Sequence, residues 1–254
     1  MKKILWLLIV VLFFGSLART NAQVFTNPIP PQINVPNQIW RNFRMGQIGS
    51  QMAADMARSK QANKNSTTTK KKAADVSKLT ANNSAIYQKQ FAFVRTEESL
   101  LAQEIIKAQK GNSNDLVKMR QLVNYMWSNY ELSFADENRR LKMPFNDVVT
   151  ALTYYIVLSY IYAKDLASLD SENSVAVYKQ VADIMSKDAD FARLQPVDKQ
   201  LFAELLIMMG GMPGAAYEKN RNKTEQMKLG QANLERIFGA QAKNLQITSN
   251  GIEF

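Results

Sequence analysis

Residues 146–164 read Asn-Asp-Val-Val-Thr-Ala-Leu-Thr-Tyr-Tyr-Ile-Val-Leu-Ser-Tyr-Ile-Tyr-Ala-Lys, and this stretch decides the fold. Between Asp147 and Lys164 it holds sixteen consecutive residues without a formal charge, and apolar side chains cover nearly every side of a helix. Such a helix lies either in the centre of a core or inside a membrane. Because a membrane span takes about twenty apolar residues, we expect a buried central helix over residues 148–163.

The start of this helix carries the most prominent polar pair of the chain. Asn146 can accept hydrogen bonds from the free amides of a first helical turn, so we expect the helix to begin there, and the negative charge of Asp147 suits the positive end of the helix dipole. Free amides at a helix start can also hold an anion or position a ligand. Asn146 and Asp147 are therefore the candidate ligand-binding residues, with helix capping as the simpler explanation of both.

Helical spacing of apolar residues predicts further helices on both sides. Their expected starts are Thr96, Ser113 or Asn114, Asp170 or Ser171, Pro196 and Ala215. We expect Gly210 and Gly211 to end the helix that begins at Pro196, and Pro213 to prevent its resumption. The last ten residues alternate about Asn250-Gly251, which predicts a short C-terminal β-hairpin. The fold class is all-α, a compact orthogonal bundle of about six helices.

The first 22 residues have the pattern of a secretory signal peptide. Lys2 and Lys3 precede eleven apolar residues, Ile4 to Phe14, and small residues permit cleavage after Ala22. The apolar run is too short to span a bilayer, and we expect no transmembrane segment in the mature chain. The sequence therefore predicts an exported protein, either periplasmic or secreted.

Residues 23–85 have the composition of a disordered linker. Four prolines lie within residues 24–38, one short helix is possible over residues 39–61, and residues 62–84 are rich in lysine and threonine. The Lys70-Lys71-Lys72 run could make a weak contact with an anionic surface, with a solvated linker as the simpler alternative. The predicted helical domain covers residues 86–254.

The composition excludes several kinds of functional site, because the chain contains neither cysteine nor histidine. A lipid-modified cysteine, a thiol nucleophile, a Ser-His-Asp triad and a histidine zinc site are all excluded. Met208, Met209 and Met212 are expected to pack in the core rather than bind copper. We expect no metal and no cofactor.

The net charge of +10 does not indicate a nucleic-acid binder. Loss of Lys2, Lys3 and Arg19 with the signal peptide lowers it to +7. Most of the remaining excess lies in residues 58–78, while residues 79–254 carry twenty basic and twenty acidic residues. A nucleic-acid footprint needs basic residues on a folded face, and we therefore expect no nucleic-acid partner.

Two motifs carry a resemblance to a known family. They are Pro144-Phe145-Asn146-Asp147-Val148-Val149-Thr150-Ala151 before the apolar helix, and Ile237-Phe238-Gly239 followed by Leu245-Gln246-Ile247-Thr248 and Gly251. Residues 90–254 thereby resemble an uncharacterised family of exported bacterial proteins, classed as a domain of unknown function. The resemblance implies export and a domain boundary, and it transfers no catalytic residue.

Two functions stay open. The favoured one is a non-catalytic module of the bacterial cell envelope that binds a protein or another envelope component. The alternative is a carboxylate-dependent cell-wall glycan hydrolase, for which the available acids are Glu98, Glu104, Glu131, Asp136, Glu137 and Glu204. Catalysis of this kind needs two acids across a cleft, one of them with a raised pKa. A binding module instead needs an apolar patch or groove.

Overall fold

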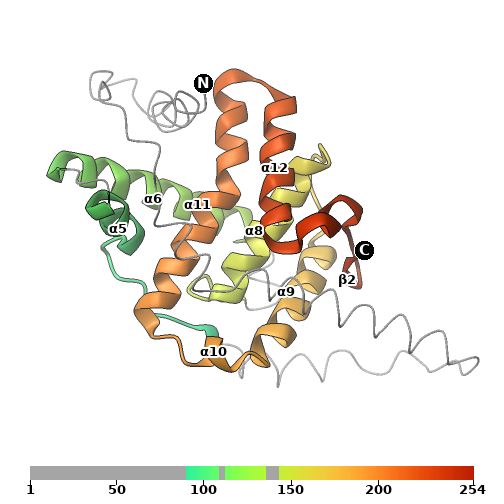
Figure 1. The fold of residues 1–254 in the computed structure, drawn as a ribbon, viewed down its shortest axis with the longest axis horizontal. Coiled ribbons are helices and arrows are strands. Elements are labelled where there is room, and N and C mark those ends of the chain that lie inside the picture. Colours follow the sequence, from blue (N-terminus) through green and yellow to red (C-terminus); the bar gives the residue numbers. More distant parts are fainter. Residues whose placement is uncertain (1–89, 109–111, 136–142) are drawn as a thin grey trace, which may run out of the picture.

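The computed structural model describes residues 90–108, 112–135 and 143–254. Within these ranges lie six helices of nine residues or more, which pack as an all-α bundle (Figure 1). They are α5 (Leu100–Ala108), α6 (Ser113–Ser133), α8 (Val148–Ala163), α9 (Ser171–Ser186), α11 (Pro196–Asn220) and α12 (Lys223–Phe238). The predicted signal peptide and linker, including residues 39–61 and Lys70 to Lys72, lie outside the described residues.

Shorter elements complete the bundle. They are the four-residue helix α10 (Ala189–Ala192), the 3-10 helix η1 (Gly239–Asn244) and the strands β1 (Gln246–Thr248) and β2 (Gly251–Glu253). The two strands pair antiparallel, with Ile247 opposite Ile252, and they pack against α9. The predicted C-terminal hairpin is therefore confirmed.

Helix α8 is the centre of the structure. Twelve of its sixteen residues are buried, and it packs against α9, α11 and α12. Figure 1 shows α11 and α12 as an antiparallel pair with α8 alongside. The predicted buried central helix is confirmed, and none of the described helices is both long and apolar enough for a membrane crossing.

The N-cap of α8 lies one residue after the predicted N-cap. Asp147 is the N-cap, and its Oδ1 accepts from the Thr150 amide at 3.0 Å. Asn146 instead accepts at its backbone oxygen from the Phe93 amide at 3.1 Å, and Ala92 forms a β-bridge with Asp147. This pairing holds the chain extended up to Asp147, so the predicted capping by Asn146 was wrong.

The prediction that Gly210 and Gly211 end a helix is also wrong. Helix α11 continues through both and ends only where Arg221 adopts a left-handed conformation, with φ of 52°. A Cβ atom on Gly210 would lie 3.2 Å from the Tyr155 Cα. Glycine therefore lets α11 approach the backbone of α8, and the packing gained outweighs the helix-propensity cost of about 1 kcal/mol per glycine.

Pro213 does not stop α11 either, because α12 supplies the missing hydrogen bond. A proline has no N–H to donate to the carbonyl four residues earlier, which here belongs to Met209. The side chain of Asn233 donates to that Met209 oxygen at 3.0 Å, and the Asn233 carbonyl accepts from the Tyr155 hydroxyl at 2.9 Å. These two bonds join α8, α11 and α12.

Helix α12 consequently begins later than the predicted Ala215. It starts at Lys223, and the side chain of Asn222 caps it by accepting from the Glu225 amide at 3.1 Å. Because α11 runs on to Asn220, the turn between the two helices lies at residues 221–222 rather than at the glycines.

We predict that Asn233→Ala destabilises the protein by about 1–3 kcal/mol, because it leaves the buried Met209 carbonyl without a partner. In a Pro213→Ala background the new amide can donate to that carbonyl, so the same substitution should cost less. Urea unfolding of the wild type, both single variants and the double variant measures the difference. An equal cost in both backgrounds would contradict this assignment of the Asn233 side chain.

Candidate functional site

Glu204, one of the candidate acids, is buried on α11 and reaches the start of α5. Its Oε2 accepts from the Ser99 hydroxyl at 2.9 Å and the Leu101 amide at 2.8 Å, and its Oε1 accepts from Gln200 at 2.9 Å. Burial raises the pKa of the Glu204 carboxyl, while these hydrogen bonds oppose the rise. Glu204 therefore acts as a cap for α5 that is supplied by another helix.

The neighbouring Gln200 explains why the first helix begins later than Thr96. Its side chain accepts from the Thr96 amide at 3.1 Å and donates to the Glu98 carbonyl at 3.3 Å. Helix α5 starts at Leu100, where the Ser99 hydroxyl accepts from the Ala102 amide at 3.0 Å. The predicted start at Thr96 was wrong, because α11 holds the residues after Thr96 outside the helix.

Asp147, a candidate ligand-binding residue, is fully buried. Its Oδ2 has no hydrogen-bond partner among the described residues. Burial raises the pKa of its carboxyl from 3.8 to about 7, against hydrogen bonds from the first turn of α8 and the charge of Lys199. Lys199 is itself buried and donates to the Gln90 carbonyl at 2.7 Å.

The other candidate, Asn146, has an exposed side chain. Neither Asn146 nor Asp147 lines the pocket between α6, α8, α11 and α12. Capping accounts for Asp147, and the ligand-binding role of the two residues stays a prediction.

Those of the remaining candidate acids that the structure describes, Glu98, Glu104 and Glu131, do not line the pocket. Glu98 lies 3.3 Å from Arg120, and Glu104 lies 3.9 Å from Lys107 on the exposed face of α5. Glu131 accepts from the indole of Trp127 at 2.8 Å. Asp136 and Glu137 lie outside the described residues.

Among the residues that the structure describes, no group of three or more acidic side chains could hold a metal ion. Met208, Met209 and Met212 are buried in the hydrophobic core, as their spacing predicted.

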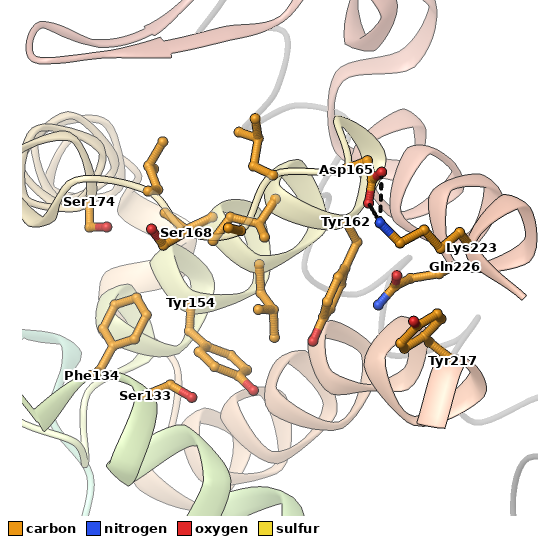
Figure 2. A pocket seen from close by; sticks show the side chains of 16 residues that line it. Ser133, Phe134, Tyr154, Tyr162, Asp165, Ser168, Ser174, Tyr217, Lys223 and Gln226 are labelled. Carbon is orange, nitrogen blue, oxygen red and sulfur yellow. Dashed lines mark hydrogen bonds and ion pairs between the residues drawn. The ribbon is translucent and has the colours of Figure 1, made fainter. Parts of the chain in front are cut away.

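One pocket of about 510 Å³ lies between the end of α6, the second half of α8, the loop after α8 and the turn from α11 to α12 (Figure 2). This volume lies within the range of small-molecule sites, about 300–1,000 Å³. Its lining residues are Ser133, Phe134, Tyr154, Val157, Leu158, Ile161, Tyr162, Asp165, Leu166, Ala167, Ser168, Leu169, Ser174, Tyr217, Lys223 and Gln226.

Aromatic and aliphatic side chains form the floor of the pocket. Phe134 and Tyr154 are buried, while Tyr162 and Tyr217 are half-buried. The Tyr162 hydroxyl lies against Gly214 of α11, where a Cβ atom would approach it to 2.3 Å. Gly214 thus provides the recess that fixes the Tyr162 ring at the pocket wall.

The charged side chains of the pocket are Asp165 and Lys223, and they pair with each other. Lys223 Nζ donates to both carboxylate oxygens of Asp165, at 2.9 and 3.0 Å. Burial raises the pKa of Tyr162 to about 12 and raises that of Tyr154 further. The lining therefore has no net charge near neutral pH, and its carboxylate is exposed rather than buried.

Sequence reasoning missed this pocket. The apolar pattern of residues 148–163 predicts that the tyrosines of α8 lie in the core, and a helix from Ala215 would contain Lys223 and Gln226 in its interior. The local clue was the number of tyrosines in residues 154–162, because a tyrosine hydroxyl needs a polar or wet environment. Only the packing of α8 against α11 and α12 shows which of them face a pocket.

We predict that Asp147→Asn changes stability in a pH-dependent way. An acid whose folded pKa is raised stabilises the fold below its unfolded pKa and loses that contribution as pH rises through the folded value. Asparagine keeps the capping oxygen without a buried charge. The melting temperature of the variant should therefore rise relative to wild type between about pH 4 and 7, by several degrees, and then level off.

Thermal unfolding of both proteins in parallel from pH 4 to 8 measures this difference, and shifts from other groups such as Glu204 cancel in the comparison. A melting-temperature difference that stays constant over the whole range would show that Asp147 is ionised throughout.

Comparison with known proteins gives the family of the chain. Neither the search of curated proteins nor the search of solved structures returned a match. A family model matches residues 1–254, so the similarity extends beyond the predicted residues 90–254 into the N-terminal part. The chain belongs to this family, which is a family of unknown function (DUF6683).

Proposed function

We propose that this protein is an exported, non-catalytic binding module of the bacterial cell envelope, and that its ligand occupies the pocket between α6, α8, α11 and α12. The observation that carries the proposal is the chemistry of this pocket. It joins half-buried tyrosines and aliphatic side chains to a few polar groups, and its one carboxylate is exposed and paired with Lys223. A largely apolar concavity with a few polar groups is typical of a ligand site.

The positions of the buried acids favour binding over hydrolysis. Asp147 and Glu204 have raised pKa values, which on their own would suggest catalytic acids. However, both cap helices, and neither lines the pocket. A glycan hydrolase needs a second carboxylate across a cleft, and the described part of the chain offers no such pair beside the pocket.

Export is supported by the N-terminal sequence. The charged start, the short apolar run and the small residues before the cleavage position together match a secretory signal. Because the chain has no cysteine, it cannot form a disulfide, and an exported fold would rely on core burial alone.

We predict that expression with the native N-terminus in a Gram-negative host gives a mature protein whose first residue is Gln23. N-terminal sequencing and intact-mass measurement of the periplasmic fraction and the medium test this. A Lys2→Glu, Lys3→Glu variant is the control, because it removes the positive start of the signal and should retain the precursor in the cells. Uncleaved wild-type protein in the cytoplasm would contradict export.

We also predict that solubilised envelope material slows amide hydrogen exchange in the wild-type protein at residues 154–169 and 217–226. Ser168→Trp should abolish this protection, because Ser168 is an exposed residue of the pocket wall and tryptophan would fill the space. Ala232→Trp is the matched control, since Ala232 is exposed on α12 outside the pocket.

Protection that survives in Ser168→Trp, or none in the wild type, would contradict pocket binding. Degradation of purified peptidoglycan by the wild type would instead support the hydrolase.

A further inference from the structure

We propose that the ligand of this pocket is a neutral carbohydrate, held with a C–H face of a sugar ring against the tyrosines and its hydroxyls at the polar rim. The inference rests on the proposed function, and it names the chemical class of the ligand. A pyranose ring has apolar faces and a polar edge, so its recognition requires flat apolar surfaces beside neutral hydrogen-bonding groups.

The flat surfaces are the rings of Tyr162 and Tyr217. Both are half-buried, so part of each ring remains accessible from the pocket. One face of Tyr217 is covered by the Arg221 guanidinium, 5.6 Å from the ring centre. Tyrosine combines an apolar ring with a polar tip, and this combination suits a ligand that is itself apolar on its faces and polar at its edge.

Polar groups lie next to these rings and on the opposite side of the pocket. In Figure 2 the Gln226 amide points from α12 toward Tyr162, and the Asp165–Lys223 pair lies beside it. Ser168 lies on the other side of the pocket (Figure 2). An amide and a hydroxyl can each donate and accept, as sugar hydroxyls do.

The charge balance of the pocket lining favours a neutral sugar over a charged small ligand. Asp165 and Lys223 neutralise each other, and burial raises the pKa of Tyr162 to about 12, so its hydroxyl keeps its proton at neutral pH. A phosphate, a carboxylate or an ammonium group would therefore find no unbalanced opposite charge among the lining residues, and the nearby Arg221 guanidinium lies over the Tyr217 ring. A wholly apolar ligand would displace water from Gln226 and Ser168 without replacing the hydrogen bonds that the water made.

The decisive experiment is titration of the mature wild-type protein with neutral tetrasaccharides, chitotetraose and maltotetraose, by calorimetry and saturation-transfer NMR. We expect at least one of them to bind. Gln226→Ala should weaken that binding about tenfold, because a ligand hydroxyl loses its partner. Ser168→Trp should abolish it, and Ala232→Trp should leave it unchanged.

Gly214 offers a second and independent test. Gly214→Ala places a Cβ atom against the Tyr162 hydroxyl and should push the ring into the pocket, which weakens saccharide binding. Adding Tyr162→Phe removes the clashing oxygen and should restore part of the affinity. Thermal unfolding of each variant checks that it is folded.

The monosaccharides N-acetylglucosamine and glucose distinguish recognition of a single sugar unit from recognition of a glycan strand. Binding of tetrasaccharides alone would assign the pocket to a strand. A neutral tyrosine-containing tetrapeptide is the competing probe.

Absence of saccharide binding together with peptide binding or envelope protection at the pocket would overturn the carbohydrate inference and leave the binding module intact. Absence of all three would overturn both proposals. Saccharide binding that persists in Ser168→Trp would place the sugar site elsewhere and also overturn the inference.

Discussion

The hydrogen bond from the Asn233 side chain to the Met209 carbonyl is the contact on which the architecture depends. It supplies the donor that Pro213 lacks, so α11 can run unbroken over Pro196–Asn220 with a proline in its interior. The Asn233 carbonyl in turn accepts from Tyr155, which ties the central helix to the same point. Because α11 continues past Pro213, Gly214 lies against the Tyr162 hydroxyl and Tyr217 reaches the wall of the pocket. The turn to α12 then brings Lys223 opposite Asp165.

The two buried carboxylates show how a raised pKa can arise from architecture rather than from catalysis. Asp147 and Glu204 lose hydration on burial, and each recovers part of that loss by accepting from amides in the first turn of a helix. Glu204 does so from a different helix, so it joins α11 to α5. The extended segment around Phe93 covers the start of α8 through its bond to Asn146. Glu204 and the backbone bond between Phe93 and Asn146 thus hold the N-terminal elements on the core.

The pocket lies along the second half of α8, away from Asp147. Its walls come from three parts of the chain that are distant in sequence, and its charged pair sits at the rim (Figure 2). The family match over residues 1–254 includes the predicted signal peptide and linker, so the N-terminal part and the helical part belong to one family unit. A family of unknown function assigns no ligand, and the chemistry of the lining is the guide to what the pocket binds.

The sequence by itself determined the all-α class, the buried helix over residues 148–163, the helix starts near Ser113, Ser171 and Pro196, and the C-terminal hairpin, because charge gaps, caps and turn residues act within a few positions. Tertiary structure alone decided that α11 passes through Gly210 and Pro213, that Glu204 caps another helix, and that Tyr162 and Tyr217 face a pocket. In α11 a contact from a distant segment offsets a local cost of about 1–3 kcal/mol, from a glycine in a helix or an unbonded carbonyl. Local sequence patterns do not specify a contact partner that is distant in the chain. The pocket is therefore defined only by the way the helices pack.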